Sequence, residues 1–332
     1  MIHRVLLAAI LLTTSAVAMA NEVNVYSARH YDTDLEVYQN FEKQTGIKVN
    51  LIEAESDVLI ERIVREGEYS PADVLLTVDA GRLFRAEQRD IFAPLESEKV
   101  SSRVPAHLSH PDGLWYALSK RARVIVYQKE AGLPEGLSTY QDLIKPEFKG
   151  KVCVRSSSNI YNISLLAAMV EHMGEEQAEA WAKGLVANFY RKPQGNDTAN
   201  VKAVASGECA LSIVNSYYVA RLIANGDPAG SAVGVLFPNQ DSTGTHVNIS
   251  GGGILKHAPN KENAKAFLEY LTEADAQSLY VEGNHEYPIV ENAETIGILL
   301  DLGTFKEDQI NASRLGANQE SAVKIFDRAG WY

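Results

Sequence analysis

Short runs of strand-forming residues alternate with amphipathic helical patterns along almost the whole of this 332-residue chain. The first two runs, residues 23–27 and 48–53, are each followed by a helical pattern, and a third run covers residues 72–77. Strands and helices that alternate in this way build α/β folds with mostly parallel sheets. The pattern therefore predicts an α/β architecture.

A second series of strand and helix patterns begins at residue 151. It contains strands over residues 151–155 and 209–214 and a helix over residues 160–173. Because the chain is longer than one hydrophobic core usually holds, the two series predict two lobes. The first lobe is expected to comprise residues 21–120 and 246–332, including the C-terminal helices, and the second lobe residues 121–245.

The chain is expected to cross between the lobes more than once. Strand patterns over residues 114–117 and 124–128 flank Arg121 and Arg123 and mark a first passage, and the strand at residues 245–249 marks a return. Repeated crossing is typical of binding proteins whose lobes close on a ligand by hinge bending. The sequence therefore predicts a hinged cleft between the two lobes.

The first 20 residues have the pattern of a secretory signal. His3 and Arg4 give a positively charged start, residues 5–12 are apolar, and the small-x-small pattern at residues 18–20 suits signal peptidase. The apolar run is too short to span a bilayer comfortably. We therefore expect cleavage after Ala20 and export of the remaining chain.

The balance of charge excludes some partners. The chain carries 43 acidic against 31 basic side chains, a formal net charge of −12. Such a surface repels nucleic acid and anionic lipid, and it attracts cations weakly at long range. Net acidity also keeps an exported protein soluble, so it does not by itself indicate a cation as the ligand.

Cys153 and Cys209 are the only cysteines, an even number in a chain bound for an oxidising compartment. Both lie on or beside short apolar strand patterns. A disulfide between them is predicted, and the alternative is a pair of buried thiols.

Tyrosines follow three separate strands at the points where helices begin. His30 and Tyr31 come after the first strand, Tyr161 follows the strand at residues 151–155, and Tyr217 and Tyr218 follow the strand at residues 209–214. Open α/β sheets present their ligands beyond the carboxyl ends of the strands. A single tyrosine at such a place is usually structural, but its recurrence at three junctions indicates a binding cleft.

The residue types at these junctions suit ferric iron. Fe(III) is a small, hard, highly charged ion that prefers anionic oxygen donors, and tyrosine is a known iron ligand. Free tyrosine has a pKa of about 10, so binding must displace its proton, and a helix N-terminus favours the phenolate. His30 adds an imidazole nitrogen. Four phenolates leave the cluster one charge negative, which Arg121 or Arg221 can balance from behind the ligands.

Other interpretations of these segments are weaker. The run Ser156-Ser157-Ser158-Asn159 before a helix offers donors to an oxyanion, but a simple helix cap is the more common use of such residues. Residues 251–253 are three glycines without the lysine of a phosphate loop, and flexible backbone at a strand end explains them better. The sequence contains no nucleophile elbow, zinc-protease motif or dinucleotide fingerprint, so no enzyme is predicted.

Several motifs in this order resemble the periplasmic ferric-binding proteins of bacterial ABC iron importers. They are Val25-Tyr26-Ser27-Ala28-Arg29-His30-Tyr31, Val78-Asp79-Ala80-Gly81-Arg82-Leu83, Asn215-Ser216-Tyr217-Tyr218, His257-Ala258-Pro259-Asn260-Lys261-Glu262-Asn263-Ala264 and Glu286-Tyr287-Pro288. The resemblance covers essentially the whole chain after residue 20. It implies a type II periplasmic-binding fold, related in lobe architecture to the transferrins, with two lobes around a hinged cleft.

The resemblance also implies a ligand set. By position, Tyr161, Tyr217 and Tyr218 correspond to the family's ligands from the second lobe, and His30 and Tyr31 to the first-lobe pair of one subgroup. That subgroup coordinates iron without an obligatory anion, although an anion or water can complete the shell.

The remaining expectations also follow from the resemblance. Arg121 and Arg221 match basic positions near the site in related sequences. The protein is expected to be a periplasmic monomer that captures Fe(III) and delivers it to an inner-membrane ABC permease. The alternative function is the binding of an oxyanion or a small organic solute by the same fold.

Overall fold

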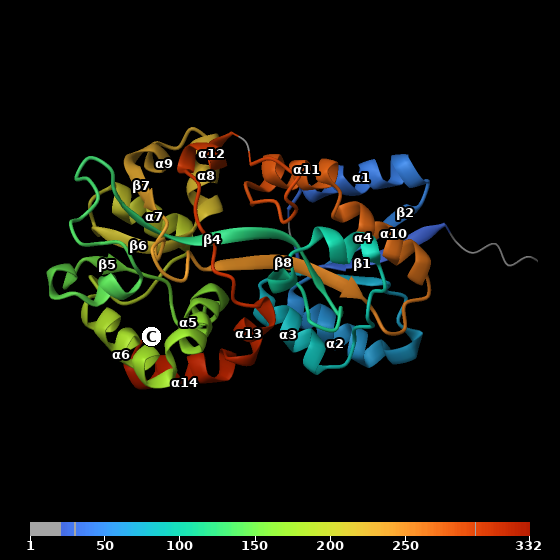
Figure 1. Ribbon diagram of the computed structural model, residues 1–332, viewed down its shortest axis with the longest axis horizontal. Helices are drawn as coiled ribbons and strands as arrows, with labels where there is room; N and C mark the ends of the chain where they lie inside the picture. Colours follow the sequence, from blue (N-terminus) through green and yellow to red (C-terminus); the bar gives the residue numbers. More distant parts are fainter. Residues whose placement is uncertain (1–20, 30, 296) are drawn as a thin grey trace, which may run out of the picture.

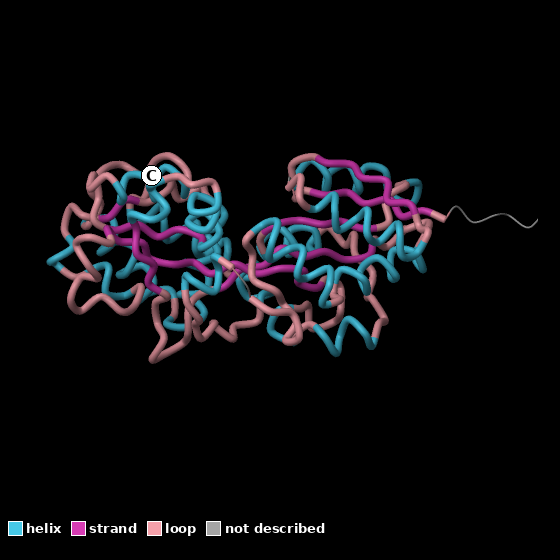
Figure 2. Tube along the Cα trace, turned by 90° about the horizontal axis from the view of Figure 1, so that it is seen from above, coloured by secondary structure: helices cyan, strands magenta, loops and turns pink. Residues whose placement is uncertain are grey.

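A computed structural model describes residues 21–29, 31–295 and 297–332. The predicted signal peptide and His30 therefore lie outside the described residues. The chain forms two lobes side by side, and strands β4 (Tyr116–Gln128) and β8 (Val247–Ile254) run through the region that joins them (Figures 1 and 2). Among the described residues, no helix is long and apolar enough to cross a membrane.

One mixed sheet passes through both lobes. Its strands follow the order β2-β1-β3-β8-β4-β6-β5, with β7 also beside β4. The other bounds are β1 Glu22–Ser27, β2 Lys48–Glu53, β3 Val74–Val78, β5 Val152–Cys153, β6 Leu211–Asn215 and β7 Val233–Leu236. Pairs β1–β2, β1–β3 and β5–β6 are parallel, whereas β8 is antiparallel to β3 and β4, and β4 is antiparallel to β6 and β7. The α/β prediction is confirmed, but the sheet is mixed because the two crossing strands run antiparallel.

Helices cover both parts of this sheet. Those before the first crossing are α1 Asp34–Thr45, α2 Ser56–Glu66, α3 Ala80–Gln88 and α4 Glu98–Arg103, and α10 Lys261–Leu271 and α11 Ala274–Asn284 follow β8. The second lobe contains α5 Ile160–Met173, α6 Glu175–Ala187, α7 Asp197–Ala205, α8 Ser216–Ala224 and α9 Pro228–Ala232. The chain ends with α12 Ile298–Leu302, α13 Ala312–Ala317 and α14 Gln319–Ala329, and short 3₁₀ helices lie at Gly67–Tyr69, Ala106–Leu108, Gln141–Ile144 and Pro146–Phe148.

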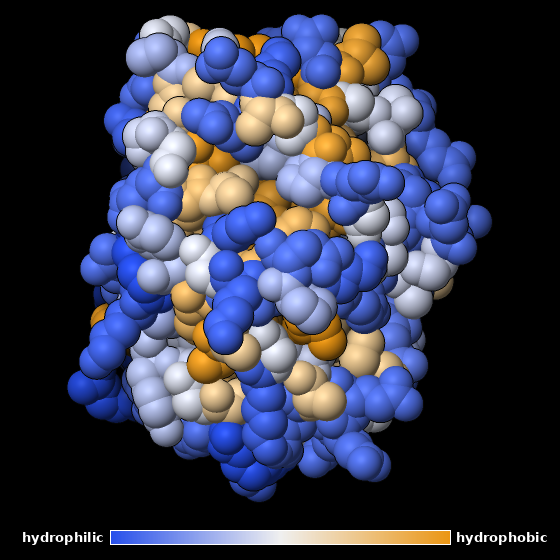
Figure 3. Space-filling view, turned by 90° about the vertical axis from the view of Figure 1, so that its left-hand side faces the viewer, coloured by the Kyte–Doolittle hydropathy of each residue, from blue (hydrophilic) through white to orange (hydrophobic). Residues whose placement is uncertain are grey.

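Each lobe has its own hydrophobic packing. In the first lobe, Phe267 of α10 lies 5.5 Å from Tyr38 and 5.1 Å from Phe41 of α1, measured between ring centroids. In the second lobe, alternate residues of β4 point to opposite faces of the sheet, so Ile125 joins one core while Val124 and Val126 join the other. At the surface of this lobe, hydrophobic residues are interspersed with many hydrophilic ones (Figure 3).

The crossing strands differ from the sequence prediction in two ways. The two short strands expected around Arg121 and Arg123 are a single 13-residue strand, β4, so both arginines lie within the passage between the lobes. The three glycines at 251–253 lie inside β8 and not at a strand end. A side chain at Gly252 or Gly253 would collide with the carbonyl oxygen of Leu75 or Leu114, so close approach of the neighbouring backbones requires glycine here.

The C-terminal helices also differ from the expectation that residues 246–332 belong to the first lobe. Helix α14 packs on α5 and α6 of the second lobe. Phe326 and Trp331 are buried there, with 4.7 Å between their ring centroids, and Trp331 lies 6.2 Å from Trp181 of α6. The apolar partners of these aromatic side chains lie in the second lobe, so burial of the rings holds the end of the chain on that lobe.

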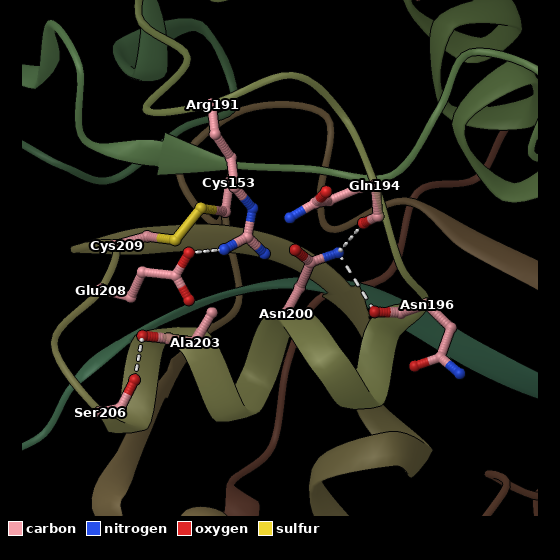
Figure 4. The surroundings of a disulfide bond; sticks show 9 residues. All are labelled: Cys153, Arg191, Gln194, Asn196, Asn200, Ala203, Ser206, Glu208 and Cys209. Atoms are coloured by element: carbon pink, nitrogen blue, oxygen red, sulfur yellow. Dashed lines mark hydrogen bonds and ion pairs between the residues drawn. A yellow bond between two sulfur atoms is a disulfide. The ribbon is translucent and has the colours of Figure 1, made fainter.

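A disulfide joins Cys153 in β5 to Cys209, which lies just before the neighbouring strand β6 (Figure 4). The Cα atoms are 5.9 Å apart and both residues are buried. The bond closes a loop across a sequence separation of 56 residues. The predicted pairing is thus confirmed.

Because a closed loop of this length restricts the unfolded chain, the double variant C153A/C209A should lower the free energy of unfolding by about 4 kcal/mol. Urea denaturation of both proteins without reductant measures the difference. Wild-type protein treated with reductant should approach the variant, and equal midpoints for all three samples would contradict a stabilising role.

Candidate metal centre

The folded chain places the four predicted tyrosines at the starts of helices. Tyr217 and Tyr218 lie in the first turn of α8, directly after β6, and Tyr161 lies in the first turn of α5. Tyr31 follows β1, and its carbonyl oxygen accepts a hydrogen bond from the backbone N–H of Asp34 at the start of α1. Strand-to-helix junctions therefore orient the phenols of both lobes toward one region.

The phenols meet between the lobes. The hydroxyl oxygens of Tyr161 and Tyr217 are 3.4 Å apart, and the rings of Tyr217 and Tyr218 stack with 4.2 Å between centroids. Tyr31 joins them from the first lobe, because the guanidinium carbon of Arg221 lies 4.9 Å from the Tyr31 ring centroid and 4.7 Å from that of Tyr217. In an octahedral shell with metal–oxygen bonds of about 2 Å, adjacent oxygens lie about 3 Å apart. The Tyr161 and Tyr217 oxygens are therefore close enough to share one ion.

His30 is the remaining predicted ligand, and it lies outside the described residues. Within the described part of the chain, no group of three or more His, Cys, Asp or Glu side chains could hold a metal ion. The tyrosines are therefore the candidate donor set in that part of the structure.

Arginines surround the tyrosine rings. The guanidinium carbons of Arg121, Arg123 and Arg155 lie 5.7, 5.9 and 5.4 Å from the Tyr161 centroid. Together with Arg29, 5.0 Å from the Tyr31 centroid, and Arg221, five guanidinium groups face the tyrosines. Their ion-pair partners in the described residues are three carboxylates, those of Asp34, Asp197 and Glu286. The excess of positive charge favours an anionic cluster at the centre.

Burial favours the protonated form of these phenols. It is the largest cause of the raised pKa of Tyr31, Tyr217 and Tyr218, because a phenolate loses its hydration there. The neighbouring phenols raise the pKa of Tyr217 further, and Arg121 opposes both effects. Ionisation of several phenols together therefore requires a compensating cation between them.

A buried carboxylate behind the tyrosines escaped the sequence analysis. Glu286 is 0% exposed, and its Oε2 atom accepts hydrogen bonds from the Ser119 hydroxyl at 2.5 Å and from Arg29 Nη1 at 3.3 Å. Burial alone would raise the pKa of this carboxyl, but Arg29, Arg121 and Ser119 hold it below its ordinary value. The only sequence signals were Arg29 beside the His-Tyr pair and Glu286 in a motif quoted for the resemblance, and neither indicated a contact.

Two buried groups near the tyrosines have unused hydrogen-bonding capacity. Arg121 donates to the Ser250 hydroxyl at 2.9 Å through Nη1, while its Nε and Nη2 atoms have no hydrogen-bond partner among the described residues. The Oε1 atom of Glu286, 3.6 Å from Arg121 Nη1, has none either. Arg121 can therefore donate further hydrogen bonds to a negatively charged cluster at the tyrosines.

Several polar groups of the serine-rich loop before α5 form hydrogen bonds within the loop or to the start of the helix. The Asn159 side chain accepts from the Tyr161 N–H at 3.2 Å, and the Ser156 hydroxyl accepts from the Ser158 N–H at 3.2 Å. The Asn162 side chain donates to the carbonyl oxygens of Arg155 and Ser156. The helix-cap interpretation is confirmed, and these contacts weaken the case for an oxyanion site at this loop.

Comparison with known proteins shows which chains this one is similar to. Residues 70–298 match the family model of the bacterial extracellular solute-binding proteins. The iron uptake protein A1 of Synechocystis is 51% identical over 314 residues, which cover 93% of this chain and 87% of that protein.

Solved structures agree over nearly the full length. The Trichodesmium protein IdiA (FutA), in complex with iron and citrate ligands, has a TM-score of 0.91 at 52% identity, covering 94% of this chain and 100% of that one. The ferric iron-binding protein A of Mannheimia haemolytica in an open conformation has a TM-score of 0.89 at 46% identity, covering 94% and 99%. The two-lobed type II binding fold predicted from the sequence is thus confirmed.

Removal of the buried Glu286 carboxylate should destabilise the fold, since Arg29 and Arg121 would each lose an ion pair, although Arg29 would keep the one with Asp34. The variant E286A should lower the free energy of unfolding by roughly 3–5 kcal/mol. The matched control E61A removes an exposed partner of Arg89 and should cost less than about 1 kcal/mol. Chemical denaturation measures both, and similar losses would show that the buried network carries no special weight.

Proposed function

This chain belongs to the bacterial extracellular solute-binding proteins, and from this premise we propose that it captures Fe(III) between its lobes with tyrosine ligands and delivers the ion to an ABC permease. The observation that carries the proposal is the meeting of Tyr31 from one lobe with Tyr161, Tyr217 and Tyr218 from the other, among buried arginines. Iron bound there holds the two lobes together.

The proposed ligands are the four phenolates together with His30. Fe(III) supplies three positive charges at the point where the phenols converge, which offsets the desolvation that keeps them protonated. Four phenolates on one ferric ion carry one net negative charge, and Arg121 and Arg221 face that charge. The place of His30 in this set rests on its position beside Tyr31 in the sequence.

The cellular setting follows from the family. Its members are extracellular solute-binding proteins, and the relatives include ferric-binding proteins of the periplasm. We assign binding and transport to this chain, with no catalytic step. Residues 1–20 serve as the export signal in this proposal, and the mature monomer works in the periplasm with an inner-membrane permease.

Tyrosinate bound to Fe(III) absorbs visible light, so protein given Fe(III) should become coloured. The double variant Y217F/Y218F should bind iron at least tenfold less tightly and develop less colour, since it lacks two anionic donors. The control Y69F/Y190F changes two exposed tyrosines and should match the wild type. Absorption spectra with metal analysis measure both effects, and a wild type that binds no Fe(III) would refute the proposal.

Iron retention should weaken as the pH falls. Burial raises the pKa of Tyr31, Tyr217 and Tyr218 above the ordinary value for tyrosine, so each phenol must release a proton when iron binds. Protons therefore compete with the ion. The dissociation constant of iron should rise roughly tenfold for each pH unit of acidification and for each phenol that must lose its proton. Chelator competition from pH 8 to pH 5 at fixed free Fe(III) tests this sign, and a constant affinity would argue against phenolate ligands.

A further inference from the structure

Asp79 is a buried carboxylate in a rare backbone conformation at the end of β3. The residue is 0% exposed and has φ 78° and ψ 125°, in the positive-φ region that residues other than glycine seldom adopt. Such strain persists only where the surrounding contacts hold it, and it is frequent at ligand clamps and switches. The contacts of Asp79 therefore indicate what the strained position accomplishes.

Both carboxylate oxygens of Asp79 are used. Oδ1 accepts hydrogen bonds from the backbone N–H of Gly81 at 2.9 Å and from the Ser164 hydroxyl at 2.8 Å. Oδ2 accepts from the side-chain amide of Asn248 at 2.8 Å. The backbone N–H of Asp79 also donates to the carbonyl oxygen of Ile249 at 2.8 Å. The two carboxylate oxygens can accept from Gly81, Ser164 and Asn248 together, whereas an asparagine has only one side-chain acceptor atom.

The contact with Ser164 links the two lobes. Asp79 lies between β3 and α3, whose residues Ala80 and Leu83 belong to the core of the first lobe. Ser164 lies on α5, where Leu165 and Leu166 belong to the core of the second lobe. Helix α13 packs on both α3 and α5 and lies between them in Figure 1.

Ser164 also lies close to an iron ligand of the proposed set. Tyr161 precedes it by three residues on α5, so the two side chains project from the same side of the helix. The hydrogen bond to Asp79 therefore fixes the first turns of α5, and with them the Tyr161 phenol, relative to the first lobe that contributes Tyr31.

We propose that the hydrogen bond between Ser164 and Asp79 is an interlobe latch that positions Tyr161 for metal binding, with Asp79 and Ser164 as positioning residues. The inference rests on the proposed iron-binding function and adds the contact that holds the helix of Tyr161 against the opposite lobe. Asn248 of the crossing strand β8 orients the Asp79 carboxylate for this role. Its own side chain is held in place because its amide oxygen accepts from the N–H groups of Ala80 and Ile249.

The variant S164A removes the latch without adding bulk. Iron-loaded S164A should remain coloured but release iron to a chelator about tenfold faster than the wild type, as expected for one lost hydrogen bond to a charged group. The matched control S212A removes another buried hydroxyl of the second lobe, one without a hydrogen-bond partner among the described residues, and it should release iron at the wild-type rate. Small-angle scattering should show a larger radius of gyration for iron-free S164A than for iron-free S212A.

A second pair of variants tests Asp79 with its orienting partner. D79N leaves an amide facing the amide of Asn248, which disturbs the orientation of the oxygen that accepts from Ser164, and it should accelerate iron release. The exchange D79N/N248D supplies the missing acceptor and should restore slow release. Wild-type protein that acquires no colour would refute the iron proposal itself. Coloured wild-type protein whose S164A and D79N variants release iron at the wild-type rate would refute the latch alone.

Discussion

One face of strand β4 carries the charged groups on which the site depends. Ser119, Arg121 and Arg123 alternate along the strand, so all three side chains leave the same face where the chain passes between the lobes. Ser119 bonds Glu286, Arg121 bonds Ser250, and Arg123 bonds Asp197, which ties segments of both lobes to the crossing strand. The tyrosines approach this row of side chains from three junctions. A shift of β4 by one residue would turn these groups toward the hydrophobic cores.

The charged and ionisable groups of this site oppose one another electrostatically. Buried phenols resist ionisation, and the arginines around them outnumber their carboxylate partners. In the function that we propose, a ferric ion resolves both conflicts, because it displaces the phenol protons and creates an anionic cluster that the guanidinium groups can face. The same balance would make the proposed binding reversible, since protons and metal compete for the same oxygens. A carrier that must release its cargo requires this kind of balance.

The sequence predicted those features of the site that depend on neighbouring residues along the chain. Strand and helix patterns located the junctions at which Tyr31, Tyr161 and Tyr217 lie, because periodicity and helix caps act over a few residues. The sequence did not reveal contacts between residues that lie far apart along the chain. Glu286 meets Arg29 across 257 positions, and no pattern in either segment signals the pair. The placement of α14 on the second lobe was missed for the same reason, since its aromatic side chains would suit either core.

What the sequence determined by itself is therefore the chemistry available: phenols, one imidazole, arginines and a pair of cysteines at defined distances from strands and helix starts. Only the tertiary structure decided which of these groups lie close together and how many charged side chains surround them. It also decided that β4 crosses as one strand and that β8 needs glycines to lie between its neighbours. Ligand type is a property of single residues, whereas the ionisation and position of a ligand depend on the buried charges and backbones that long-range packing brings beside it.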